Sequence, residues 1–140
     1  RFLRSARRWP PELSLSEHLV ADTVDFPLSP EYIDDEVAAL RIGTLTATEP
    51  ALRATYLMVH DEMERGLAPV IADRLGLPAD DLTVRLCAAA VTGAFRVIDE
   101  DVGRAVIVEG KSVSQAEALA LVDRAIREAT NGRVGGPVDR

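Results

Sequence analysis

The chain has 140 residues, about the commonest size for one domain, and folding at this length removes roughly 68–70% of the unfolded chain's surface from water. Hydrophobic residues make up 47% of the sequence and charged residues 28%, which excludes a disordered chain. The formal net charge of −7 argues against nucleic-acid binding by this chain itself, since such binding needs a basic face that displaces counterions from phosphates.

Three further features bound the class of protein. No apolar run approaches the ~18 residues of a membrane-spanning helix and no signal-peptide pattern opens the chain, so we expect a cytoplasmic protein. Cys87 is the only cysteine, which excludes an internal disulfide and a cysteine-rich zinc site. Four arginines and no acid lie in the first eight residues, which indicates the solvated end of a helix or, alternatively, a segment near DNA or a basic domain.

Helix start signals recur along the first half of the chain. Ser14 followed by Glu17 fits a capping box. Ser29 before Pro30 places a capping side chain ahead of a proline in the first turn, and residues 48–50 (TEP) repeat that arrangement. The apolar positions that we expect to face inward in the first two helices are Leu15, Leu19 and Val20, and then Ile33, Val37, Leu40 and Leu45.

The helix that begins at Pro50 is predicted to be the longest. Its apolar positions recur in steps of three and four, which places them on one face. Pro69 predicts a kink, or a split near Gly66, because proline removes a backbone hydrogen bond. Gly76 followed by Pro78 predicts the end. The apolar set is Leu52, Tyr56, Val59, Met63, Leu67, Val70 and Ile71.

Two more helices follow. Asp80 or Asp81 caps the first of them, whose middle is lined by small residues that permit close approach of another helix. Residues 102–113 contain a short β-branched run without any partner strand, so we expect a loop or a helix extension there. Ser114 and Glu117 form another capping box, and the last helix ends at Asn131 and Gly132.

The predicted fold is therefore an all-α bundle of about five to six helices. Residues 1–132 are expected to form one domain. Residues 133–140 contain two glycines and a proline with little to bury, which predicts a flexible C-terminal tail.

Catalytic chemistry has few candidates in this sequence. No G-x-S-x-G, phosphate loop or G-x-G-x-x-G occurs, so we expect no enzyme, no catalytic residue and no cofactor. His18, the pair His60 and Asp61, and a later aspartate (Asp99, Asp101 or Asp123) superficially match the ligands of HD-type metal phosphohydrolases. We keep that alternative, although an i,i+4 pair of His60 with Glu64 is a simpler interpretation and predicts no metal site.

One edge of the long helix has the composition of a ligand site. Arg53, Tyr56, His60 and Met63 follow one another at spacings of three, four and three. A small-molecule pocket is usually apolar with a few placed polar groups, and this edge fits that description. Plain core packing, with the polar tips reaching solvent, is the alternative from periodicity alone.

The order and spacing of several segments resemble the C-terminal domain of bacterial transcriptional regulators of the TetR family. The segments are the Ser29 and Pro30 helix start, TEPALR (48–53), ADRLGL (72–77), the Asp80 and Asp81 cap, and LCAAAVTGAF (86–95). The resemblance covers roughly residues 2 to 130. The helix-turn-helix domain that precedes this region in the family is absent from the sequence, so DNA binding is expected only through that missing domain.

The resemblance implies a ligand-sensing and dimerisation domain. The last two long helices would form a four-helix bundle with a second copy, giving a homodimer, and a small hydrophobic effector would bind among the other helices. A helical interaction module without a ligand is a further alternative. The implied ligand-binding residues are Arg53, Tyr56, His60, Met63, Phe26, Leu40 and Phe95. The implied dimer interface contains Ala90, Gly93, Ala94, Val97, Leu119, Val122 and Ile126.

Overall fold

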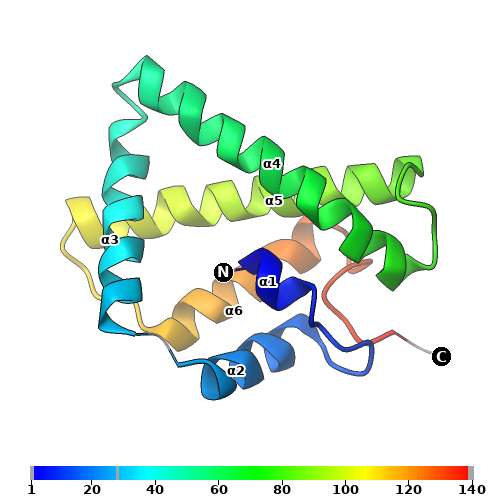
Figure 1. The fold of residues 1–140 in the computed structure, drawn as a ribbon. Coiled ribbons are helices and arrows are strands. Elements are labelled where there is room, and N and C mark those ends of the chain that lie inside the picture. The colour runs from blue at the N-terminus through cyan, green and yellow to red at the C-terminus, as the bar shows by residue number, and fades with distance from the viewer. Residues whose placement is uncertain (1, 28, 139–140) are drawn as a thin grey trace.

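A computed structural model describes residues 2–27 and 29–138, which form six α-helices and a short π-helix and contain no strand (Figure 1). The predicted all-α class is confirmed. The helices are α1 (Phe2–Ala6), α2 (Leu15–Asp25), α3 (Pro30–Leu45), α4 (Pro50–Leu75), α5 (Leu82–Gly103), the π-helix η1 (Arg104–Val108) and α6 (Gln115–Ala129).

Side-chain caps start four of these helices. Ser14 and Ser114 form full capping boxes with the glutamates three residues later. The Ser29 side chain accepts a hydrogen bond from the Tyr32 amide, and Asp81 caps α5. These four predicted starts are confirmed, and α4 begins at Pro50 without a side-chain cap.

The long helix α4 also ends where the sequence predicts. Gly76 adopts the left-handed conformation, with φ of 65°, in which a side chain would be strained. The helix does not split near Gly66 and continues through Pro69 as one element. Beyond α5, residues 104–108 form η1, so the β-branched run is a helix extension, as one of the two alternatives predicted.

Helix α5 occupies the centre of the bundle and packs against α3, α4 and α6. Figure 1 shows α4 crossing α5 obliquely, with α2 at the bottom of the view and α6 between α2 and α5. Helix α3 stands across one end of these helices, and α1 packs on α4 (Figure 1).

The hydrophobic core lies away from α3. Buried apolar side chains come from α1, α2, the second half of α4, the first half of α5, α6 and the C-terminal segment, whereas α3 has no buried residue. The inward stripe predicted for α3 is wrong at two positions, because Ile33 is 48% and Leu45 is 51% exposed. Val20 on α2 is also exposed. The core consists of Ala6, Leu15, Leu19, Leu67, Ile71, Ala72, Val84, Cys87, Ala88, Val91, Ile126 and Val134.

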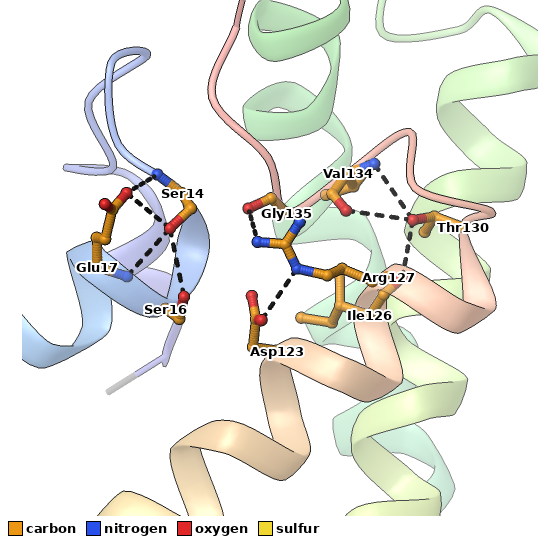
Figure 2. Close-up of polar contacts among 9 residues, drawn as sticks. All are labelled: Ser14, Ser16, Glu17, Asp123, Ile126, Arg127, Thr130, Val134 and Gly135. Atoms are coloured by element: carbon orange, nitrogen blue, oxygen red, sulfur yellow. Dashed lines mark hydrogen bonds and ion pairs between the residues drawn. The ribbon is translucent and has the colours of Figure 1, made fainter.

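Residues 133–138, predicted to be a flexible tail with little to bury, pack on the body of the bundle. Val134 is buried, and its amide donates a hydrogen bond of 3.2 Å to the Thr130 hydroxyl (Figure 2). The Gly135 carbonyl accepts bonds from the Leu15 amide and from Arg127. Backbone hydrogen bonds hold this segment, and such bonds leave no apolar pattern in a sequence. Residues 139 and 140 lie outside the described residues, as does Arg1.

Candidate functional site

Three adjoining hollows lie among the helices, with volumes of about 300, 320 and 590 Å³. Glu36 of α3 and Asp99 of α5 belong to the walls of all three, so we describe the hollows together as the central cavity. Pockets for small organic molecules usually measure about 300–1,000 Å³, so each hollow is large enough for part or all of one. Residues shared by two of the walls are Phe2, Tyr32, Leu40, Val59, His60 and Phe95.

The hollow between α3 and α4 carries the polar ring groups. Tyr56 and His60 lie one turn apart on α4, with ring centroids 4.3 Å apart. The Nδ1 atom of His60 lies 2.9 Å from the Tyr56 carbonyl oxygen, which only accepts, so this nitrogen donates. In the neutral ring Nε2 is then left as an acceptor for another group.

The hollow bounded by α1, α2, α3, α5 and α6 contains an aromatic pair. The rings of Phe2 and Phe95 pack against each other with centroids 4.1 Å apart. Leu119 and Val122 of α6 lie in the same wall and also pack against the core. These side chains would bury an apolar part of a ligand without displacing any hydrogen bond.

Two carboxylates from facing helices set the electrostatics of the cavity. The Tyr32 hydroxyl donates a hydrogen bond of 2.6 Å to Oε1 of Glu36. Asp99 remains accessible to solvent through the open cavity, yet loss of hydration among the helices raises the pKa of its carboxyl group to about 6, against the attraction of His60 and with repulsion from Glu36 and Glu100. Loss of hydration, with Asp99 nearby, also raises the pKa of Tyr56 to about 12.

A second polar cluster joins α1 to α2 beside the cavity. Arg8 forms an ion pair with Asp22 at 2.5 Å, and Nε2 of His18 lies 2.8 Å from the Ser5 carbonyl oxygen. Although burial opposes it, hydrogen bonds from Arg8 and Ser5 hold the pKa of Asp22 below its usual value. Because these groups bond to one another, they fix α1 in its position rather than offering free ligand contacts.

Five of the seven predicted ligand-binding residues line the central cavity. They are Leu40, Tyr56, His60, Met63 and Phe95. Arg53 is exposed on α4 and belongs to none of these three walls. Phe26 lies at the end of α2, with the Arg8 guanidinium 4.6 Å from its ring centre, and borders a separate hollow.

The sequence interpretation missed Glu36, Asp99, Tyr32 and Phe2. A signal for two of them was present, because Tyr32, Glu36 and Leu40 follow at steps of four and therefore share one face of α3. Asp99 lies four residues after Phe95 on α5, so it shares a face with a predicted pocket residue. Phe2 carried no signal, since five helical residues are too few to show a period.

A second face of α5 is apolar and exposed to solvent. Leu82 is 66%, Leu86 60% and Val97 47% exposed, and these positions share a face with Ala90 and Gly93. A Cβ atom built on Gly93 would meet nothing within 4 Å. Of the predicted interface residues, Ala90, Gly93, Ala94 and Val97 lie on α5 with part of their surface in solvent.

The predicted interface residues of α6 lie mostly inward. Leu119 and Val122 contribute to the cavity wall, and Ile126 is 1% exposed in the core of the protomer. The accessible apolar residues of this helix include Leu121, at 37% exposure, and Ala129. Leu121 is therefore the stronger candidate for contact with another chain.

The residues considered for a metal site serve other purposes. His18 bonds to Ser5, and His60 bonds to the Tyr56 carbonyl. Within residues 2–27 and 29–138, no three His, Cys, Asp or Glu side chains gather so that they could hold a metal ion. Over the same residues, every helix is too short or too polar to cross a bilayer.

Comparison with known proteins identifies one family. Residues 31–133 match the family described as MftR C-terminal domain, a C-terminal domain of the TetR type, and the match spans well over half of the chain. No curated protein and no solved structure matches the sequence.

Proposed function

The chain belongs to the MftR C-terminal domain family, and from this premise we propose that it binds a small effector in the central cavity and dimerises through α5 and α6, thereby controlling DNA binding by a separate N-terminal domain. In this proposal the protein is a bacterial, cytoplasmic regulator, and no residue has a catalytic role. Repression and activation are equally compatible with it.

The observation that carries the proposal is the central cavity. It is bounded by apolar side chains from α1 to α6, and polar groups such as Tyr56, His60 and Asp99 lie among them, as in small-molecule sites. A helical interaction module without a ligand would have no reason to keep this interior open, because filling it would stabilise the fold.

The dimer proposal is supported by the outward face of α5. Leu82, Leu86 and Val97 form an exposed apolar stripe, and Gly93 lets a second helix approach closely. Burial of this stripe against a second copy would generate the four-helix bundle that the family resemblance implies. Leu121 of α6 would extend the contact.

Control of DNA binding requires that effector and DNA favour different states of the dimer. An effector shifts such an equilibrium only by the difference between its affinities for the two states. Helix α1, which contributes Phe2 to the cavity wall and whose Ser5 bonds to His18 of α2, would connect the ligand to the segment before it.

A thermal-shift screen tests effector binding. A hydrophobic small molecule at a hundredfold excess over its Kd is expected to stabilise the chain by about 2.7 kcal/mol. Tyr56→Ala should remove most of that stabilisation, whereas Leu57→Ala, an exposed position on α4 outside the three walls, should leave it unchanged. Hits that ignore Tyr56→Ala would mean that the cavity is not the binding site.

Analytical ultracentrifugation tests the dimer. Gly93→Arg places a long charged side chain on the outward face of α5, where the protomer has open space, and should give a monomer. Gly43→Arg is the matched control, because a Cβ atom there also meets nothing within 4 Å and the residue lies on α3. Wild-type chain that sediments as a monomer at tens of micromolar, or Gly93→Arg that remains dimeric, would contradict the proposal.

A further inference from the structure

The walls of the central cavity contain more negatively charged than positively charged side chains. Its walls contain the carboxylates of Asp22, Glu36, Glu62 and Asp99, whereas Arg7, in the largest hollow alone, is the one arginine or lysine among the wall residues described above. Asp22 is neutralised by its ion pair with Arg8. The interior therefore carries an excess of negative charge, which a purely hydrophobic ligand would leave uncompensated.

Glu36 and Asp99 concentrate that charge at the junction of the three hollows. They come from facing helices, α3 and α5, and repel each other, which is part of the reason that Asp99 holds its proton more tightly than usual. Tyr32 donates to one oxygen of Glu36, and His60 attracts Asp99. Among residues 2–27 and 29–138, no arginine or lysine forms an ion pair with either carboxylate. A ligand cation placed between them would relieve the repulsion.

Aromatic rings surround the same junction. Both tyrosines of the chain and two of its three phenylalanines lie in the walls of the central cavity, although aromatic residues make up 4% of the sequence. The faces of such rings carry negative potential and attract cations, most strongly where water is partly excluded. Carboxylates and ring faces in one cavity therefore favour the same kind of ligand.

We propose that the effector is an organic cation, with a positive centre held between Glu36 and Asp99 and apolar or aromatic groups extending into the Phe2 and Phe95 hollow. This proposal rests on the proposed function, since it names the ligand class of the same cavity. A bare metal ion would not use the apolar walls, and the described residues offer no cluster of three ligands for it.

Three probes of similar shape and different charge test the proposal by isothermal titration calorimetry on the wild-type chain. They are tetraphenylphosphonium (cationic), triphenylphosphine oxide (neutral) and tetraphenylborate (anionic). The cation should bind about tenfold more tightly than the neutral probe or better, and the anion should bind most weakly, because the cavity carries like charge. Raising the salt concentration should weaken binding of the cation but not of the neutral probe.

Substitutions that remove one negative charge test which carboxylates bind the cation. Glu36→Gln and Asp99→Asn should each weaken tetraphenylphosphonium binding about five- to tenfold and leave triphenylphosphine oxide unaffected. Asp35→Asn is the matched control, an exposed carboxylate next to Glu36 on α3 that is absent from the three walls, and should leave both affinities unchanged.

The outcomes separate this proposal from the one on which it rests. Neutral or anionic probes that bind as tightly as the cation, salt-independent binding of the cation, or an Asp35→Asn effect equal to that of Glu36→Gln would overturn the organic cation. If uncharged compounds stabilise the wild-type chain in a manner that depends on Tyr56 while tetraphenylphosphonium does not bind, the cavity remains the effector site and only the cation is wrong. If no compound stabilises the chain, both proposals fail.

Discussion

The two ends of the bundle are built differently. The base, formed by α2, the second half of α4, the first half of α5, α6 and residues 133–138, contains almost all of the buried apolar side chains. The open end, formed by α3, the first half of α4 and the second half of α5, contains the Tyr56, His60 and Asp99 part of the central cavity, and α3 has no buried residue. Stability therefore resides in the base, and in the proposed function the open end adapts to a ligand.

The largest expected contrast comes from removing the same side chain at each end. Leu15 in the base is fully buried, so Leu15→Ala should cost about 2–5 kcal/mol of unfolding free energy by loss of transfer energy and creation of a cavity. Leu40 at the open end already faces a hollow, so Leu40→Ala should cost about 1 kcal/mol of unfolding free energy or less. Urea denaturation measures both values, and equal losses would show that the ends are equally packed.

Arg74 provides the second contrast, because it joins three segments of the base. Its guanidinium donates to the carbonyls of Pro10, Leu13 and Gly136 and lies 3.3 Å from the ring centre of Trp9. Arg74→Met should therefore cost about 2 kcal/mol, the typical contribution of hydrogen bonds to a charged group.

Arg96 at the open end is the matched control for Arg74. Its ion pair with Glu100 is partly exposed, so Arg96→Met should cost less than about 1 kcal/mol in the same urea experiment. An unchanged free energy of unfolding in Arg74→Met would mean that the three hydrogen bonds of Arg74 contribute nothing to the stability of the base.

Helix caps give a smaller difference between the ends. Ser14 caps α2 in the base and bonds to both the amide and the carboxylate of Glu17, whereas Ser29 caps the exposed start of α3. Ser14→Ala should cost about 1 kcal/mol and Ser29→Ala about half as much, as measured by thermal melting. If Ser29→Ala lost more stability than Ser14→Ala, α3 would have to unfold together with the core.

The raised pKa of Asp99 makes the stability of the chain depend on pH, and this is the smallest of the expected effects. Its pKa in the folded chain is about 6, above its usual value of 3.8, so between these pH values the folded state binds more protons than the unfolded state and stability falls as pH rises. The groups that set this pKa are Glu36 on α3, His60 on α4 and Glu100 on α5 itself, together with loss of hydration.

Asp99→Asn should therefore raise the Tm above pH 6 and have no such effect below about pH 4. Because solvent reaches the carboxylate, the gain should not exceed about 1 kcal/mol, or roughly 4 °C. A gain of equal size at both pH values would mean that the substitution acts through packing and not through charge.

Helix boundaries were predictable from the sequence at both ends of the bundle. Serine and aspartate caps and the Gly76 stop are local signals, so the starts of α2, α3, α5 and α6 and the end of α4 follow directly from residue order. Phe95 and Tyr56 were predicted to lie in a pocket and do line one. Residues 133–138 were missed because their backbone groups bond to Leu15, Arg74, Arg127 and Thr130, and the packing that brings these groups together leaves no local pattern.

The inward face of α3 could not be derived from apolar periodicity. Its apolar residues Ile33 and Leu45 lie outward, while Tyr32 and Glu36 face the cavity, because a cavity does not demand an apolar lining as a core does. That Glu36 and Asp99 line the same hollows depends on the packing of α3 against α5, which no local pattern encodes. Polar residues at helical spacing are the signal that an open site leaves.

Hydrogen exchange of the chain, with and without the panel compound that raises the Tm most, tests the division between base and open end directly. Without ligand, amides of α3 should exchange at least about tenfold faster than those of α2 and the first half of α5, because few buried contacts oppose local opening. With ligand, exchange should slow mainly in α3 and in the α4 and α5 turns that carry Tyr56, His60 and Asp99. Uniform protection of α3 and the base without ligand, or ligand protection confined to the base, would contradict the account.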